Sequence, residues 1–244
     1  MTHPYFDPAQ AAVFNELSTA RDSTFEVSYF GLHGFAGVTR TILAAGGANF
    51  KNYVPADWAT EKPSAPFGVI PLLKETSKDG SKTIHVAESD AIERYLAKKF
   101  GFTGANAFEE TLVNTYAAHT TALFQQCFLK YFGTKDEEVK AKAKADMASG
   151  SIPGWVNFHE KYLAANGSNG HYVGDKTSLA DIKTYHILGL LQSLTGEDLI
   201  SESKTPAIWK VKTTLESMPS VRAWRETEDF KAFSEKNLNF LGYP

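Results

Sequence analysis

The spacing of hydrophobic residues changes once along this chain, near residue 101. Before that point, short aromatic and β-branched runs alternate with helical patterns in the order strand, helix, strand, strand, strand, helix. From residue 108 onward, strand signals are absent and the helical period prevails. The sequence therefore predicts an N-terminal extension over 1–24, an α+β domain with a mixed sheet over 25–101, and an all-α domain over 108–244.

Each element of the predicted α+β domain has a local signal. The Gly46-Gly47 pair closes the first helix, and Asp79-Gly80 supplies the turn of a hairpin. The last helix of the domain is amphipathic. The predicted strands are 25–30, 49–54, 70–75 and 82–86, and the predicted helices are 38–45 and 89–100.

The second half predicts long helices over 108–132 and 136–165. Pro153 and its neighbouring glycines should kink or divide the second of these. Further on, Ser178 and Asp181 have the spacing of an N-terminal capping box at the start of an apolar helix. We interpret this box as structural, because nothing about it requires a ligand.

Pro71 stands in an apolar run that otherwise reads as a buried strand. A proline lacks the N–H that strand pairing needs, so it marks an edge or a backbone distortion. With a cis Ile70-Pro71 bond, the backbone of Ile70 would pair with an extended peptide from outside the sheet. Nearby, Glu88-Ser89 begins a helix. The Ser89 hydroxyl and the free N–H groups of the first helical turn suit a carboxylate. One short peptide could reach both places.

Composition narrows the classes of partner. The 244 residues are 43% hydrophobic and 22% charged, typical of a globular protein, and the formal charge of -3 offers no basic surface for nucleic acid. No apolar run approaches the roughly 20 residues of a membrane span, and the acidic N-terminus does not resemble a targeting signal. We therefore expect a cytoplasmic protein without a nucleic-acid or membrane partner.

The candidates for metal or cysteine chemistry are weak. The seven histidines are scattered and show no metal-ligand spacing, so we expect no metal. The single cysteine, Cys127, lies mid-helix among apolar residues and is expected to be a buried, inert thiol. His33 follows the first strand closely, but an ordinary loop histidine is the simpler interpretation.

Several short motifs together resemble the cytosolic glutathione transferases, which join a thioredoxin-like domain to an all-helical one. Their order and spacing are more specific than any single motif. The interval from Trp58 to Pro71 is most similar to the sigma class, one of the classes that use a catalytic tyrosine. The motifs are Ser28-Tyr29-Phe30, Trp58 to Pro63, Ile70-Pro71, Glu88 to Leu96, Ser178 to Asp181, and Pro219 to Trp224.

The resemblance implies glutathione as co-substrate, an extended tripeptide with two carboxylates, an ammonium and a thiol. Each of these groups needs a partner, because an unpaired buried polar group costs affinity. Ser89 suits the γ-glutamyl carboxylate, Glu88 the ammonium, and the backbone of Ile70 the cysteinyl amide. Taken singly, each residue also has an ordinary structural reading. The implied glutathione-binding residues are Trp58 and Lys62 for the glycyl carboxylate, together with Ile70, Pro71, Glu88 and Ser89.

Tyr29 is the catalytic residue that the resemblance implies. Without the resemblance, a tyrosine at a strand end is read as packing. A free thiol has a pKa near 8.5, so only about 3% is ionised at pH 7. A hydroxyl that donates to the sulfur anion lowers this pKa by about two units, or ~2.7 kcal/mol. The thiolate would then attack an electrophilic carbon by addition or substitution.

The second substrate is expected to be a hydrophobic electrophile in an apolar pocket between the domains. Leu32 and Phe35 would contribute from the loop after the first strand, and Phe124 and Phe128 from the first long helix. Core packing explains the two helical phenylalanines equally well. The sequence does not name the electrophile.

Three positions depart from the family pattern. Gly37 replaces an acidic residue, Phe35 replaces an arginine near the thiol, and Ala118, beside His119, replaces an aspartate that reaches the partner's ligand. We expect a two-fold homodimer in which Glu88 supplies the ammonium contact within each chain.

Three functions are compatible with these residues. The first is a detoxifying glutathione transferase, which adds the thiolate to hydrophobic electrophiles. The second is a glutathione-dependent isomerase, in which the thiol adds reversibly. The third is a noncatalytic binding or interaction protein with this fold, which the departures allow and the presence of Tyr29 disfavours.

Overall fold

The computed structural model describes residues 7–196 and 199–240, which form two compact units. The first unit runs to Phe100 and resumes at Pro219, and the second spans Gly101–Met218. The predicted domains are continuous segments of the chain, whereas these units group the residues that contact one another. The two groupings differ in where they put residues 219–240.

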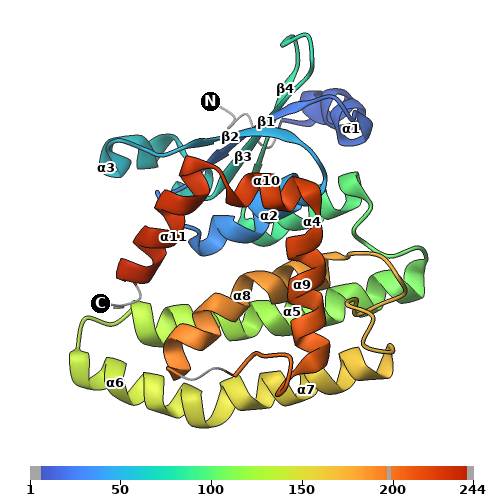
Figure 1. The fold of residues 1–244 in the computed structure, drawn as a ribbon. Helices are drawn as coiled ribbons and strands as arrows, with labels where there is room; N and C mark the ends of the chain where they lie inside the picture. Colours follow the sequence, from blue (N-terminus) through green and yellow to red (C-terminus); the bar gives the residue numbers. More distant parts are fainter. Residues whose placement is uncertain (1–6, 197–198, 241–244) are drawn as a thin grey trace. The chain divides into compact units, whose positions relative to one another are not determined.

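The first unit is built on a four-stranded sheet in the order β2-β1-β3-β4 (Figure 1). β1 is parallel to β2 and antiparallel to β3, and β4 is antiparallel to β3. Every predicted strand and helix of this region is present, with ends moved by one or two residues. The elements are α1 (Ala11–Thr19), β1 (Thr24–Ser28), α2 (Gly37–Ala45), β2 (Asn49–Tyr53), α3 (Trp58–Glu61), β3 (Leu72–Thr76), β4 (Thr83–Ala87), α4 (Ser89–Phe100), α10 (Pro219–Arg225) and α11 (Glu228–Phe240).

The two central strands, β1 and β3, alternate buried and more exposed positions. On β1, Phe25 and Val27 are buried while Glu26 and Ser28 are partly exposed. Such alternation places one face of a strand against the core. The helices α2 and α4 pack together, and α4 also contacts β3 and β4. The mixed sheet with its helices and the helical second unit confirm the predicted fold class.

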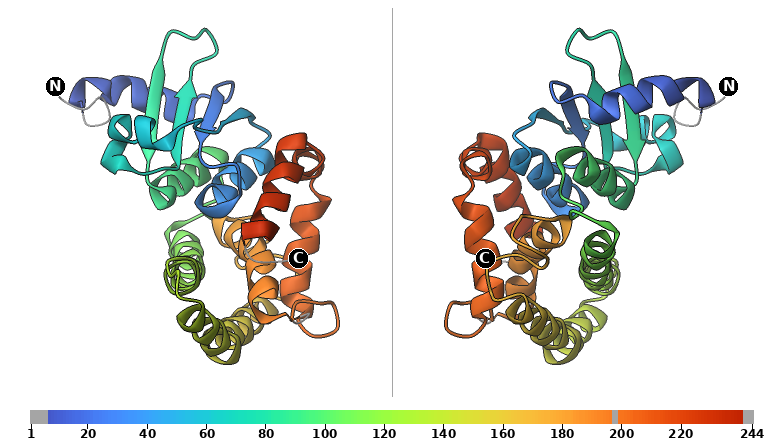
Figure 2. Two further views of the ribbon diagram at one scale, coloured as in Figure 1. Left: turned by 90° about the vertical axis from the view of Figure 1, so that its left-hand side faces the viewer. Right: turned by 90° about the vertical axis from the view of Figure 1, so that its right-hand side faces the viewer.

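The N-terminal extension contributes α1 to the first unit, where it packs against β4 and α4 (Figure 2). A buried ion pair joins Lys99 Nζ to Glu75 Oε1 at 2.9 Å, with side chains 1% and 0% exposed. The same ammonium donates to the carbonyl oxygens of Leu17 and Ala20, and Tyr95 donates to Glu75 at 2.6 Å. A cation at the end of α1 complements the helix dipole, so this lysine ties the extension to the sheet.

All the regular elements of the second unit, within the residues that the structure describes, are helices. The predicted interruption near Pro153 takes the form of a π-helical turn at Met147–Ser151 between α6 and α7, and Pro153 is the second residue of α7. The backbone stays helical through this turn, since Asp146, Ser151 and Ile152 all have α-region dihedral angles, so the helix changes its hydrogen-bond pattern and does not end. The elements are α5 (Ala107–Cys127), followed by a π-helical turn (Phe128–Phe132), α6 (Glu137–Asp146), α7 (Ile152–Ala165), α8 (Leu179–Thr195) and α9 (Pro206–Ser217).

The capping box predicted at the start of α8 is present and has a second role. Asp181 Oδ2 accepts from the Ser178 N–H at 2.7 Å, and its Oδ1 accepts from the Tyr172 N–H at 2.9 Å. The box thus also fixes the loop before the helix. Cys127 is 0% exposed, which confirms the predicted burial, and burial raises the pKa of its thiol to about 12, as expected for an unreactive thiol.

In the part of the chain that the structure describes, no helix combines the length and apolar character needed to cross a bilayer. The same residues contain no group of three or more histidine, cysteine or carboxylate side chains that could hold a metal ion.

Candidate active site

Tyr29 follows the last residue of β1 and is 4% exposed. Its N–H donates to the carbonyl of Tyr53 at 3.0 Å, which extends the pairing of β1 with β2 by one residue. Its hydroxyl oxygen accepts from the backbone N–H of Phe35 at 3.2 Å. Because this oxygen already accepts one hydrogen bond, its own proton is available for donation to a ligand.

Gly34 allows the loop to fold back over Tyr29. Its φ of 39° lies in the left-handed region, and a Cβ there would be 2.8 Å from the Tyr29 hydroxyl oxygen and 2.7 Å from Leu32 Cδ1. Any larger residue would collide with the hydroxyl. Glycine at this position is therefore part of the site.

The electrostatic surroundings keep Tyr29 protonated. Burial raises its pKa above the ordinary value of 10.0, while the Phe35 N–H and the charge of Arg40 oppose the rise. The guanidinium carbon of Arg40 lies 5.9 Å from the centre of the Tyr29 ring. At neutral pH the hydroxyl is thus a hydrogen-bond donor and not a base.

Aromatic contacts connect Tyr29 to Trp58. The ring of Phe30 lies 5.3 Å from that of Tyr29 and 6.1 Å from that of Trp58. Trp58 begins α3, whose N-cap Asp57 accepts from the Ala59 N–H at 3.0 Å. The capped helix and the aromatic contacts together place this indole.

Lys62, Ile70 and Pro71 lie between α3 and β3. Lys62 is exposed, and its chain runs past Gly68, where a Cβ would be 3.4 Å from the lysine Cε. The Ile70-Pro71 bond is cis. Strand pairing begins only at Leu72, opposite Ser28, so Ile70 precedes the paired part of β3.

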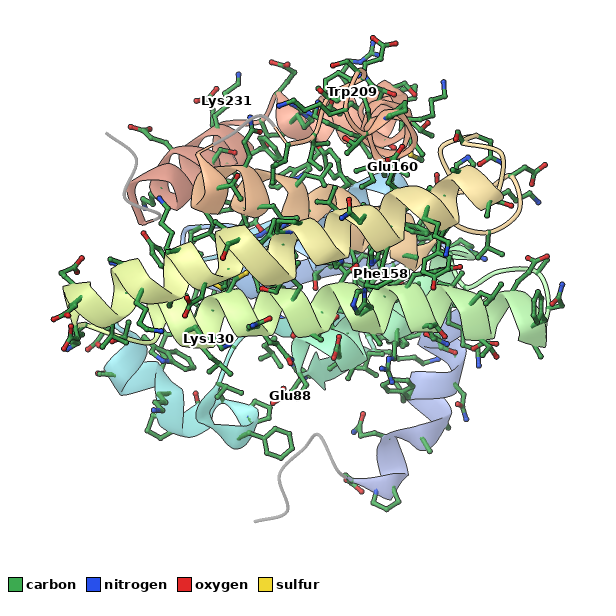
Figure 3. All side chains as sticks on the ribbon, turned by 90° about the horizontal axis from the view of Figure 1, so that it is seen from below. Glu88, Lys130, Phe158, Glu160, Trp209 and Lys231 are labelled. Atoms are coloured by element: carbon green, nitrogen blue, oxygen red, sulfur yellow. The ribbon has the colours of Figure 1, made fainter. Side chains whose placement is uncertain are left out.

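Glu88 and Ser89 form the turn from β4 into α4. Glu88 has a φ of 70°, unusual for a residue with a side chain, and its carbonyl accepts from the Ile92 N–H at 2.9 Å. Non-glycine residues in this conformation cluster at ligand sites. The Glu88 side chain is exposed (Figure 3), and Ser89 is the first residue of α4, where helix N–H groups lack internal partners.

The first unit contains every predicted glutathione-binding residue as well as Tyr29. It also contains Leu32 and Phe35, whereas Phe124 and Phe128 belong to the second unit. There Phe124 lies 5.7 Å from His186, and Phe128 begins the π-helical turn. The shared hydrophobic pocket stays a prediction.

Sequence reasoning missed Arg40 and its partners. Arg40 is 0% exposed in α2, and Asn52 of β2 accepts from its Nε at 2.7 Å. One signal was present: a single charged residue stands in the otherwise uncharged segment Gly37–Ala45. A charge in such a helix is expected to have a buried partner.

Comparisons with known proteins decide the family. The family described as "Glutathione S-transferase, C-terminal domain" matches residues 124–228. "Probable glutathione S-transferase 7" of Caenorhabditis elegans is 31% identical over 215 residues, covering 86% of this chain and 98% of that relative. The chain belongs to the glutathione S-transferase family.

Two further relatives of this glutathione S-transferase are informative. "Hematopoietic prostaglandin D synthase" of Gallus gallus is 27% identical over 202 residues, 82% of this chain and 94% of that protein. The solved structure "Fasciola hepatica sigma class GST" has the same fold, with a TM-score of 0.71, 24% identity, and coverage of 84% and 95% of the two chains. The resemblance drawn from the motifs and the enzyme class are confirmed, while the roles of individual residues stay predictions.

Proposed function

We propose that this glutathione S-transferase binds glutathione in its first unit, ionises the thiol beside Tyr29 and adds the thiolate to a hydrophobic electrophile. The observation that carries this proposal is the Tyr29 hydroxyl. It is buried, it accepts the Phe35 N–H at 3.2 Å, and its pKa is raised, so it is a fixed, protonated donor. A fixed donor at the position of a developing anion is the main device of electrostatic catalysis.

The proposed reaction joins the sulfur of glutathione to an electrophilic carbon of the second substrate. The thiol proton leaves to solvent, and the thiolate accepts the Tyr29 hydroxyl proton in a hydrogen bond. The sulfur lone pair then forms a carbon–sulfur bond. In substitution the leaving group departs with the bonding electron pair, and in addition the resulting carbanion takes a proton from solvent. The protein supplies thiolate stabilisation and proximity.

The remaining groups of glutathione find partners among the predicted residues. The exposed Lys62 and the indole N–H of Trp58 suit the glycyl carboxylate, and the first turn of α4 with Ser89 suits the γ-glutamyl carboxylate. Glu88 suits the ammonium. For the electrophile we retain the sequence-based pocket residues Leu32, Phe35, Phe124 and Phe128.

Replacing Tyr29 with phenylalanine tests the proposal. The hydroxyl acts on a charge that develops fully only in the thiolate, so Tyr29→Phe should lower kcat with an aryl halide about 25-fold at pH 7 and leave the glutathione Kd within a few-fold. The reason is that a rise of the thiol pKa from about 6.5 to about 8.5 lowers the ionised share from about 75% to about 3%. Tyr53→Phe is the control, because that exposed hydroxyl donates to Glu61 at 3.0 Å. An unchanged rate and thiol pKa in Tyr29→Phe would refute the role.

An isomerase is the second candidate, favoured by the similarity to a prostaglandin D synthase over 82% of this chain. In an isomerase the same thiolate adds to the substrate and is later expelled, so glutathione is not consumed. Product analysis distinguishes the two, because a transferase converts glutathione stoichiometrically into a thioether. Tight glutathione binding by calorimetry without either product would indicate the noncatalytic alternative.

We further propose a two-fold homodimer located in the cytoplasm, with detoxification as its role. Two copies of the 26.8 kDa chain would give a doubled mass in light scattering. A monomer mass at micromolar protein would contradict the dimer and leave the proposed chemistry untouched.

A further inference from the structure

The last helix, α11, contacts the loop that follows Tyr29. His33 Nε2 and Ser234 Oγ are 3.0 Å apart, and the His33 ring lies 4.8 Å from that of Phe230. A Cβ on Gly31 would lie 3.0 Å from Lys236 Nζ, so this ammonium rests against the loop backbone. All of these residues belong to the first unit.

Arg40 connects the same loop to α11 from inside the unit. Its Nη1 donates to the Leu32 carbonyl at 2.6 Å and its Nε to Asn52 Oδ1 at 2.7 Å. Its guanidinium carbon lies 4.3 Å from the centre of the Phe233 ring of α11 and 5.9 Å from that of Tyr29. A buried guanidinium over an aromatic face is favourable, so Phe233 helps to hold the charge in place.

A second connection runs through β2. Asn52 accepts from Arg40 through its side-chain oxygen and donates through Nδ2 to Asp229 Oδ2 of α11 at 2.8 Å. The Asp229 carboxylate thus orients the side-chain amide of Asn52, and this amide in turn orients the guanidinium of Arg40. Arg40 Nη2 is buried and has no hydrogen-bond partner in the described part of the chain. A buried donor in this state is costly and points to a functional reason for the placement.

We propose that α11 acts as a clamp that holds the loop after Tyr29 in place. Arg40 is the positioning residue through which α11 acts on Tyr29. The clamp consists of Asp229, Phe233 and Ser234. It holds the loop so that the Phe35 N–H and the Tyr29 hydroxyl keep their geometry, and it fixes one positive charge beside them. This inference rests on the proposed function of Tyr29.

The electrostatic part of the clamp has a clear direction. A fixed cation near the sulfur site favours the thiolate over the thiol. The resemblance placed an arginine at the position of Phe35, and Arg40 is a buried cation of α2 near the same tyrosine. The other titratable groups that contact this network are His33 in the loop and Asp229 and Lys236 on α11. Burial lowers the pKa of Arg40 to about 10, and the charge of Asp229 is among the interactions that oppose this fall.

The clamp is tested by removing the two polar contacts of α11 together. Asp229→Ala with Ser234→Ala leaves Phe233 and the core intact, and Lys231→Ala with Glu235→Ala is the matched control on exposed positions of the same helix (Lys231 is labelled in Figure 3). The measurements are kcat and KM for glutathione with an aryl halide, and the pKa of the bound thiol from thiolate absorbance. A thermal melt checks the fold of each variant.

The clamp variant should lower kcat 3- to 10-fold (~0.7–1.4 kcal/mol), with KM within about two-fold and the control unchanged. Loss of the Asp229 anion would by itself lower the bound thiol pKa, so the expected rise of about 0.5–1 reports displacement of the Arg40 charge. Arg40→Met should have a larger effect in the same direction, and Arg40→Lys an intermediate one. If Arg40→Met does not fold, the clamp variant still decides the question. A clamp variant with wild-type kcat and thiol pKa overturns the inference. Wild-type enzyme that leaves bound glutathione un-ionised at neutral pH would instead overturn the proposed function.

Discussion

Tyr29 and Arg40 are 4% and 0% exposed, whereas Lys62 and Glu88, which are proposed to bind the two charged ends of the tripeptide, are exposed. The part of the site around Tyr29, called the thiol end here, is thus held by contacts within the chain. The parts proposed for the two charged ends of the tripeptide, together called the peptide end, present side chains to solvent. Substitutions at the thiol end should therefore disturb geometry and stability together. Substitutions at the peptide end should change ligand affinity alone.

The chemistry of the two ends explains this difference. Stabilising a thiolate needs donors that are fixed before the charge develops, in surroundings where water does not screen them. The carboxylates and ammonium of a tripeptide are already charged in water, and their partners must release them after turnover. Exposed partners suit that exchange, because a fully desolvated charge pair is costly to form.

The largest effect should come from Gly34→Ala at the thiol end. A methyl group would meet the Tyr29 hydroxyl at 2.8 Å in a backbone with a φ of 39°, so the loop must move. We expect a loss of kcat/KM above 100-fold and destabilisation of about 1–3 kcal/mol. Gly47→Ala is the control, because its φ is 65° and a Cβ there would meet no atom within 4 Å. Equal effects on activity in the two variants would show that the loop around Tyr29 is not locked.

The next effect is expected at the peptide end, from Glu88→Gln. Charge-assisted contacts are worth about 1.5–3 kcal/mol. Glu88→Gln should therefore raise the glutathione Kd by about 10- to 100-fold. Ser89→Ala should raise it only about five-fold, because the first-turn N–H groups of α4 would still donate to the carboxylate. Calorimetry measures both, and denaturant melts should match wild type. Wild-type affinity in Glu88→Gln would mean that the ammonium has another partner, such as His119 or the second subunit.

A smaller effect is expected from Asp57→Ala, which removes the N-cap of the helix that begins with Trp58. Without the cap the indole loses part of its support, so glutathione affinity should fall a few-fold at unchanged kcat. The hydrogen bonds from the Thr60 side chain and from the backbone lower the Asp57 pKa. The cap is therefore retained until the solution becomes strongly acidic, and wild-type affinity should not fall between pH 7 and 5 for this reason. A kcat defect in Asp57→Ala would link the two ends.

The smallest effect is expected at alkaline pH. The pKa of Tyr29 lies above 10.0, so its hydroxyl stays protonated and donating as pH rises. After kcat/KM rises with ionisation of the bound thiol, it should stay level up to about pH 10. In Tyr29→Phe the midpoint of that rise should move upward by about two pH units. A fall in wild-type kcat/KM between pH 8 and 9.5, with the fold intact, would show that the thiol end is more exposed than its burial indicates.

Local signals in the sequence predicted more of the peptide end than of the thiol end. Pro71, Ser89 and the Asp-Gly turn each determine the conformation of the backbone next to them. Their structural effects can therefore be predicted from residues only a few positions away. The positive φ of Glu88 was not predicted, because glutamate has no preference for that conformation. The requirement for Gly34 was also missed, since it depends on a hydroxyl five residues earlier folding back under it.

The amino-acid sequence by itself determined the order of strands and helices, the hairpin, the interruption in the helix before Pro153, the capping box at Ser178 and the resemblance to a family. These follow from the periodicity of apolar residues and from turn and cap residues, whose physics is local. Only the tertiary structure decided that α11 belongs to the same unit as the sheet and that Lys99 donates to a carbonyl at the C-terminal end of α1. It also decided that Arg40 joins the loop after Tyr29 to Asp229 through Asn52. Those contacts join residues far apart in the chain, and the burial of a charge is settled by whichever partners the folded chain brings to it.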